Sequence, residues 1–211
     1  MFTGIIEDVG RVVRVELGTL CIESRLDGIQ VGDSVAVNGI CLTVSSIFQH
    51  GNHVRLAFNF SPETTAVTTV GEFRAGSAVN IERALRVDGR FGGHIMTGHI
   101  EGTGRLWKRR REGNSHTFTF SSDRKLEKYI IPKGSIGVDG ISLTVAESRN
   151  GFFSVSVIPY TLGHTNLHDI VVGQSVNIEP DLLAKYTESV LTAAGRTNPI
   201  TEEILRQNGF M

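Results

Sequence analysis

Short segments of apolar and β-branched residues follow one another along most of the chain, and Gly, Asn or Asp separates them. Residues 10–15, 34–37 and 53–58 are three examples. Runs of this length between turn-forming residues predict β-strands at short spacing. Asn38-Gly39 and Asp139-Gly140 each lie between two such runs, which is typical of hairpin turns with positive φ. The pattern therefore predicts small antiparallel β-barrels.

Beyond Asp181 the apolar spacing becomes helical, and the recurring residues are Leu182, Leu183, Tyr186, Val190, Leu191 and Ala194. Gly195 is placed to end this helix. A second short helix is expected at residues 201–207, with Thr201 as N-cap, Glu202 and Glu203 in its first turn, and Gly209 after it. The apolar stripe of the longer helix needs a partner, which is either its own barrels or another subunit.

Three segments occur twice in the same order, which indicates an internal duplication. Residues 37–44 and 138–145 differ only by Asn38 against Asp139 and Cys41 against Ser142. Two further pairs match in the same way, residues 3–11 with 97–105 and residues 79–82 with 176–179. Collinear matches of this kind argue for two copies of one domain of about 95 residues rather than for a solenoid.

The duplication suggests where the domains lie and what they bind. We expect one domain at residues 1–94, a second at 95–189 that includes the start of the helix, and a tail at 190–211. Two matching pockets imply two similar ligands, or one ligand bound twice.

Composition narrows the class of partner. A net charge of -1 and a pI near 6.7 give no electrostatic reason to expect nucleic acid or an anionic membrane as the main partner. The cationic run at residues 108–111 precedes a turn signal and is expected to form a solvated hairpin tip. No leader pattern and no run of about 18 apolar residues occurs, so we expect a cytoplasmic protein. Cys21 and Cys41 suggest neither a disulfide framework nor a zinc site.

Side-chain alternation places small polar residues together in each copy. If residues 40–44 form a strand, Cys41 and Thr43 share one face, and the same parity pairs Ser142 with Thr144. A half-exposed strand facing water and a ligand pocket are alternatives for either copy alone. The recurrence in both copies favours the pocket.

The segment 92–101 at the junction of the two copies carries His94, His99 and Glu101. A metal site is disfavoured because residues five apart on a strand point to opposite faces and no cysteine completes the ligand set. Two interpretations remain: a histidine that hydrogen-bonds a ligand or carries a proton, and a histidine with a structural role. Nucleotide-binding glycine motifs and GxSxG are absent, and Ser142 has only Asp139 near it in sequence. The residues alone indicate a binder of two related small molecules.

Taken together, the motifs resemble those of the riboflavin synthase family of the α-chain type. The resemblance rests on the opening Met-Phe-Thr-Gly-Ile, on Asn-Gly-x-Cys-Leu-Thr-Val with its Asp-Gly-x-Ser-Leu-Thr-Val counterpart, and on Gly-Gly-His-x-Met-x-Gly-His between them. It spans residues 1–190. It implies two six-stranded Greek-key β-barrels and a C-terminal helix that holds a homotrimer together, with the N-terminal barrel of one subunit against the C-terminal barrel of a neighbour.

The resemblance also implies a transferase reaction. Two molecules of 6,7-dimethyl-8-ribityllumazine exchange a four-carbon unit and give riboflavin and 5-amino-6-ribitylaminouracil, without a redox cofactor or metal. Association with lumazine synthase is a further expectation. The alternative is the antenna type of lumazine protein, which binds the chromophore without turnover and is monomeric. A flavin-dependent oxidoreductase would need a nicotinamide site, for which the sequence gives no signal.

Carried over by position, the first half-site comprises Gly4, Ile5, Ile6, Ser34, Cys41, Leu42, Thr43, Asn59, Phe60, Ser61, Pro62, Glu63 and Thr64. The second comprises His99, Ile100, Glu101, Ser142, Leu143, Thr144, Ser156, Val157, Ile158, Pro159, Tyr160 and Thr161, with Lys133 reaching across to the first. The catalytic residues implied are Cys41, His99, Ser142, Thr144, Asp139 and Phe2. Cys41 or a water beside it attacks C7 of the acceptor, His99 with Thr144 or Ser142 handles protons at the donor, and Phe2 closes over the site.

Overall fold

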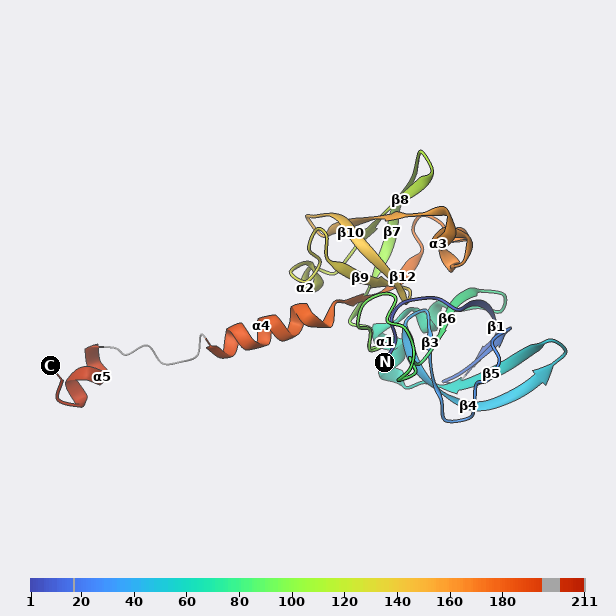
Figure 1. Cartoon of the computed structure of the whole chain (residues 1–211), viewed down its shortest axis with the longest axis horizontal. Coiled ribbons are helices and arrows are strands. Elements are labelled where there is room, and N and C mark those ends of the chain that lie inside the picture. The colour runs from blue at the N-terminus through green and yellow to red at the C-terminus, as the bar shows by residue number, and fades with distance from the viewer. Residues whose placement is uncertain (17, 195–201, 211) are drawn as a thin grey trace. The chain divides into compact units, whose positions relative to one another are not determined.

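The computed structural model describes residues 1–16, 18–194 and 202–210. It divides into two units, residues 1–181 and residues 182–211, and each is described by itself. The first unit contains two β-barrels, which appear in blue to green and in green to orange in Figure 1. The second unit contains the C-terminal helices.

The first barrel, called the N-barrel, is closed in the strand order β1-β2-β5-β4-β3-β6, and every pairing is antiparallel. Its strands are β1 (Asp8–Glu16), β2 (Thr19–Ser24), β3 (Ser34–Val37), β4 (Ile40–His50), β5 (His53–Asn59) and β6 (Ala78–Arg83). The connection from β5 to β6 contains the helix α1 (Pro62–Val67) and the 3-10 helix η1 (Thr69–Glu72).

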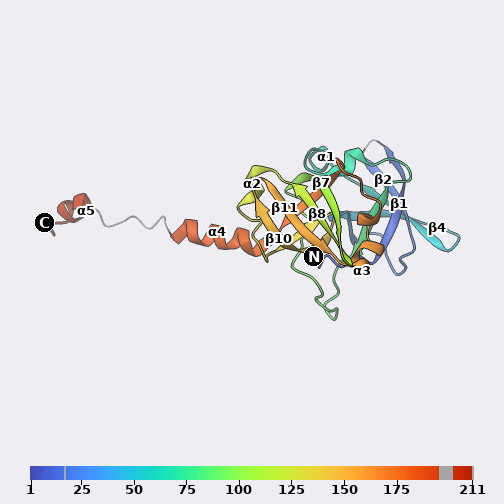
Figure 2. The same cartoon turned by 90° about the horizontal axis from the view of Figure 1, so that it is seen from above.

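The second barrel, called the C-barrel, repeats this topology as β7-β8-β11-β10-β9-β12. Figure 2 labels β7, β8, β10 and β11 of this barrel. Its strands are β7 (Gly102–Glu112), β8 (Ser115–Ser121), β9 (Ser135–Val138), β10 (Ile141–Arg149), β11 (Phe152–Val157) and β12 (Ser175–Pro180). Its connections contain α2 (Arg124–Glu127), α3 (Pro159–Gly163) and the 3-10 helix η2 (Asn166–His168). The predicted fold of two six-stranded antiparallel barrels is confirmed.

Local sequence explains the turns. Asn38 and Gly39 join β3 to β4 with φ values of 45° and 78°, and Asp139 and Gly140 join β9 to β10 with the same two values. These are the positive φ angles that a two-residue hairpin turn requires, as the sequence predicted. The turn after the cationic run lies at residues 113–114, but the cations themselves belong to β7, where Arg109 lies over the ring of Phe118 at 5.1 Å.

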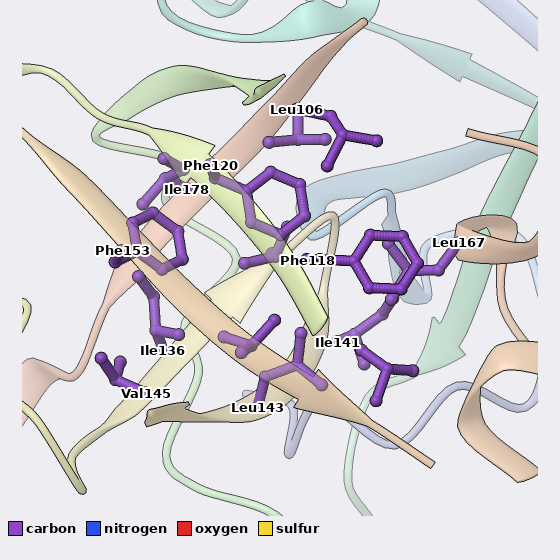
Figure 3. Packing of buried hydrophobic residues seen from close by; sticks show 14 of the residues in the cluster. Leu106, Phe118, Phe120, Ile136, Ile141, Leu143, Val145, Phe153, Leu167 and Ile178 are labelled. Atoms are coloured by element: carbon purple, nitrogen blue, oxygen red, sulfur yellow. The ribbon is translucent and has the colours of Figure 1, made fainter. Parts of the chain in front are cut away.

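Each barrel encloses its own apolar core. In the C-barrel, Phe118, Phe120 and Phe153 are buried, and the Phe120 and Phe153 ring centroids are 5.5 Å apart (Figure 3). Aliphatic residues such as Val35, Leu56 and Ile81 fill the N-barrel. Buried and more exposed residues alternate along strands such as β2 and the first half of β4, so these strands turn one face outward. Every residue of β12 is buried.

The second unit contains α4 (Leu182–Ala194) and α5 (Glu202–Gln207). The stripe on α4 is exposed: Leu183 is 60 % exposed and Leu191 66 %. The predicted helix end at Gly195 and N-cap at Thr201 lie outside the described residues. Among the helices of the described part, none is long and apolar enough to span a membrane.

Candidate active site

The predicted polar faces exist in both barrels. Leu42 and Val44 point into the N-barrel core, whereas Cys41 is half-buried and Thr43 is exposed. Leu143 and Val145 are likewise in the C-barrel core, while Ser142 is half-buried and Thr144 is exposed. The parity inferred from the sequence therefore holds in each copy.

Neighbouring strands extend these faces into polar rows. Ser34 on β3 lies opposite Thr43 on β4, and Asn59 follows Phe58, which lies opposite Val44. In the C-barrel, Ser135 lies opposite Thr144, and Ser156 follows Val155, the partner of Val145. The sequence interpretation included Ser34 but missed Ser135, although the duplication itself relates the two.

The segments after β5 and β11 continue beside these rows. Ser61 is the N-cap of α1 and accepts a hydrogen bond from the Thr64 N–H, with Pro62 in the first turn and Glu63 exposed. Phe60 is half-buried against the N-barrel core. Ile158 occupies the corresponding N-cap of α3 without a side-chain bond. The two edges therefore differ chemically at equivalent positions.

The rest of the C-barrel segment combines core and surface residues. Val157 is buried in the core, and Pro159 and Thr161 belong to α3. The exposed ring of Tyr160 stacks on His164 with centroids 4.1 Å apart. Lys133 is exposed in the loop before β9 with a φ of 68°, a strained backbone conformation for a residue other than glycine.

Two short segments, at residues 3–6 and 97–100, each contact both barrels. We call them the first strap and the second strap. Each is anchored to its own barrel by a buried glutamate. Glu82 on β6 accepts hydrogen bonds from the backbone N–H groups of Thr3 and Gly4, at 2.7 and 2.9 Å. Glu179 on β12 accepts the equivalent bonds from Thr97 and Gly98. Burial raises the pKa of both carboxyls, although the strap hydrogen bonds oppose this shift.

Each strap then reaches the other barrel. The Gly4 carbonyl accepts the Ser142 N–H at 2.9 Å, and the Gly98 carbonyl accepts the Cys41 N–H at 2.9 Å. Ile6 packs against the C-barrel core and Ile100 against the N-barrel core.

Each strap therefore contacts both barrels. The backbone of Gly4 meets Ser142, and the backbone of Gly98 meets Cys41. The exposed Ile5, however, lines a cavity with Ser34 of its own barrel, so the expected grouping of the half-sites stays a prediction. We call the surroundings of Cys41 and of Ser142 the Cys41 cradle and the Ser142 cradle. Glu101 lies just beyond the second strap, where its N–H donates to the Ile178 carbonyl.

Asp139 occupies a different environment from the one expected of a catalytic residue. It is 1 % exposed at the contact between the barrels, and its carboxylate accepts hydrogen bonds from the Asn177 N–H and the Asn166 Nδ2, at 2.8 and 2.9 Å. Burial raises its pKa from 3.8 to about 7, although those hydrogen bonds act in the opposite direction. Its backbone carbonyl accepts a hydrogen bond from the Asn80 Nδ2 of the N-barrel at 2.9 Å, so the structure favours a role at the contact between the barrels.

Phe2 is also placed differently. It is 1 % exposed, pairs with Met96 through two backbone hydrogen bonds, and forms a small apolar cluster with Met96 and Ala36. Cys41 packs against this cluster. Phe2 is thus a packing residue beside Cys41, whereas we expected it to close over the site.

His94 is the one buried histidine among the described residues, and its Nδ1 lies 2.7 Å from the Ser142 Oγ. Burial lowers its pKa, partly offset by the charge of Asp181. His99, by contrast, is exposed on the second strap. The two histidines thus differ in burial, although their segment is not the strand from which opposite faces were expected. In the described part of the chain no group of three or more His, Cys, Asp or Glu residues could hold a metal ion.

Comparisons with known proteins agree with this architecture. The family model described as the lumazine binding domain matches twice, at residues 3–84 and 97–181. The riboflavin synthase of Actinobacillus pleuropneumoniae is 40 % identical, and that of Bacillus subtilis (strain 168) is 36 % identical, each over 100 % of both chains. The chain belongs to the riboflavin synthase family. The riboflavin synthase of Mycobacterium tuberculosis (strain ATCC 25618 / H37Rv) is also 40 % identical, over 92 % of this chain and 100 % of the relative.

Solved structures show the same fold. The crystal structure of LumP complexed with riboflavin has a TM-score of 0.75 at 23 % identity, covering 85 % of this chain and 99 % of LumP. LumP complexed with 6,7-dimethyl-8-(1'-D-ribityl) lumazine has a TM-score of 0.72 at 22 % identity, covering 85 % and 98 %. Both family and fold thus match the resemblance drawn from the sequence motifs.

Proposed function

We propose that this protein is a riboflavin synthase that converts two molecules of 6,7-dimethyl-8-ribityllumazine into riboflavin and 5-amino-6-ribitylaminouracil. The observation that carries the proposal is the pair of nearly equivalent cradles, each with a small polar residue whose backbone N–H is fixed by the strap of the other barrel. A dismutation needs two places for the same compound. The full-length identity to several riboflavin synthases supports the enzyme over a non-catalytic antenna protein.

The reaction redistributes the atoms of two lumazines between the two products. The 7-methyl group of the donor loses a proton and becomes a carbon nucleophile, and C7 of the acceptor receives a nucleophile. Holding the two rings face to face makes the encounter effectively intramolecular, which is worth several kcal/mol, up to about 7–11 in well-oriented models.

The proposed role of each residue follows from the chemistry of its side chain. The Cys41 thiol, or a water beside it, is the nucleophile for C7, and the exposed His99 imidazole on the adjacent strap carries protons. Thr144 and Ser142 assist in proton handling in the other cradle. The polar rows beside them suit the ribityl hydroxyls, while strand-end backbone groups suit the edge of the heterocycle.

Assembly is the second part of the proposal. The protein forms a homotrimer in which the N-barrel of one subunit faces the C-barrel of a neighbour, and Lys133 reaches the neighbouring cradle. The exposed apolar stripe on α4 supports this, because such a stripe is stable when another surface covers it. We further propose domain boundaries at residues 94 and 189, a cytoplasmic location, and lumazine synthase as a candidate partner.

Incubation of the purified protein with the lumazine alone tests the activity. Riboflavin and 5-amino-6-ribitylaminouracil are expected to appear in equal amounts. A static change in lumazine emission without either product would contradict the enzyme assignment and support the antenna type.

Replacement of Cys41 tests the nucleophile. Cys41→Ala is expected to reduce kcat by at least tenfold, on the order of the effect of removing one catalytic group, while lumazine still binds. Cys21→Ala is the matched control, since Cys21 is a half-buried cysteine of β2. Equal turnover in the two variants would reject the role of Cys41.

A further inference from the structure

We propose that His94 is a positioning residue that makes Ser142 a directed hydrogen-bond donor toward the ligand of the Ser142 cradle. The inference rests on the proposed function for the identity of the ligand, a ribityl-substituted heterocycle with acceptor atoms. The contact that it concerns is formed by the protein alone.

The histidine is held rigidly against the serine. His94 is 7 % exposed, its Nδ1 lies 2.7 Å from the Ser142 Oγ, and its backbone N–H donates to the Thr3 carbonyl. Gly93 makes this approach feasible, because a Cβ there would collide with the Thr3 carbonyl oxygen and lie 3.0 Å from the Ser142 Oγ. The first strap, the junction segment and β10 therefore meet at one point.

The other ring nitrogen determines which atom carries the hydrogen. Nε2 is buried and has no hydrogen-bond partner among the residues that the structure describes. A buried N–H without an acceptor is rarer in proteins than an acceptor without a donor. The neutral ring therefore carries its hydrogen on Nδ1, and this N–H donates to the Ser142 Oγ.

The serine is left with one free hydrogen. Its backbone N–H is bonded to the Gly4 carbonyl, and its Oγ accepts from His94, so its hydroxyl hydrogen is available to a third group. Ser142 lies on the half-buried outer face of β10 beside the exposed Thr144. A carbonyl, ring nitrogen or hydroxyl oxygen of a ligand is the matching acceptor.

Among the described residues, the Cys41 cradle has no equivalent hydrogen bond from a buried histidine. Its Cys41 N–H is bonded to the Gly98 carbonyl in the same way, but the Cys41 Sγ forms no hydrogen bond within the described residues. His94 thus makes the two related cradles chemically unequal, with an oriented hydroxyl donor in one and an uncommitted thiol in the other.

A set of variants tests this coupling through riboflavin binding, measured by calorimetric titration. Loss of one hydrogen bond predicts that His94→Leu and Ser142→Ala each weaken binding about three- to tenfold. The double variant should bind no more weakly than either single variant, because both remove the same bond. His94→Asn, whose amide nitrogen falls close to the position of Nδ1, should restore affinity to within about twofold of wild type.

The exposed His168, whose Nδ1 lies 2.8 Å from the Asp169 carboxylate, supplies the control variant His168→Asn, which should bind as wild type does. Additive losses in the double variant, or a His94→Asn variant as weak as His94→Leu, would overturn the proposal.

A second measurement does not depend on how the variants fold. Nitrogen-15 NMR of the histidine-labelled wild-type protein should show His94 as the neutral tautomer with hydrogen on Nδ1. A neutral ring with hydrogen on Nε2 overturns the proposal. Neither experiment requires turnover, so a protein that binds riboflavin with this coupling but makes none from lumazine would refute the proposed function and leave the His94 inference standing.

Discussion

Replacing Asp139 with asparagine is expected to flatten the dependence of stability on pH. Asp139 is buried at the contact between the barrels, and burial raises its pKa from 3.8 to about 7. The folded protein therefore holds this proton more tightly than the unfolded chain does. The resulting stabilisation is fully present below pH 3.8 and is lost as pH rises through about 7.

The size of the Asp139 pKa shift determines how strongly the free energy of unfolding depends on pH. A shift of about 3 pH units, at 1.36 kcal/mol per unit, corresponds to about 4 kcal/mol over the whole window. Between pH 5.5 and pH 8.5 the protein passes through about 1.5 pH units of this window, so its free energy of unfolding falls by about 2 kcal/mol. Asn at this position cannot ionise, so the variant should lose that difference. Its absolute stability also falls, because the introduced amide nitrogen faces the Asn166 Nδ2, which is another donor.

The assay is urea unfolding followed by far-UV circular dichroism at pH 5.5 and 8.5, at one fixed protein concentration. The quantity compared is the change in unfolding free energy between the two pH values, so that contributions of other titrating groups cancel between variants. Asp27→Asn, at an exposed aspartate of the same chain, should keep the wild-type change. If Asp139→Asn also keeps it, the buried carboxyl does not titrate in this window and the reasoning is wrong.

Two further outcomes follow from the same structure. Gly39→Ala should destabilise the protein by about 2 kcal/mol or more in denaturant unfolding, because φ is +78° and the new Cβ would lie 2.8 Å from the Gly140 nitrogen. The control is Gly51→Ala, where φ is +61° but the space is open, and it should cost only about 1 kcal/mol. Equal losses in the two variants would exclude the close approach as the cause. If the proposed trimer forms, Tyr186→Glu on the exposed stripe of α4 should convert it to a monomer in light scattering. Thr192→Glu, at an exposed position outside the predicted apolar stripe of the same helix, should leave it intact. A trimer with both variants would mean that this stripe does not hold the subunits together.

The two histidines show how far local sequence reasoning extends. Strand alternation predicted opposite orientations for them, and the structure shows His94 buried and His99 exposed, but neither residue lies in a strand. Alternation, however, does not state what a buried side chain contacts. The hydrogen bond from His94 to Ser142 joins residues that are far apart in the chain, and no pattern near either residue indicates it.

The contacts of the straps were not predictable for a related reason. Because residues 3–6 and 97–100 are similar, each could in principle contact either barrel, and the motifs contain no information that separates the arrangements. In the structure each strap contacts both barrels: Ile6 packs against the C-barrel core and Ile100 against the N-barrel core, whereas Ile5 lines a cavity with Ser34 of the N-barrel.

The sequence by itself determined the duplicated barrels, the Asn-Gly and Asp-Gly turns, the outward faces of Cys41 and Ser142, and the helix that begins at Leu182. These features depend on steric preferences and periodicities of residues close together in the chain. Only the tertiary structure decided that each strap contacts both barrels, that Phe2 packs inside, and that the Asp139 carbonyl accepts a hydrogen bond from Asn80 of the other barrel. Such contacts depend on which surfaces meet when two similar domains dock, and that outcome is set by the shape and burial of both surfaces together.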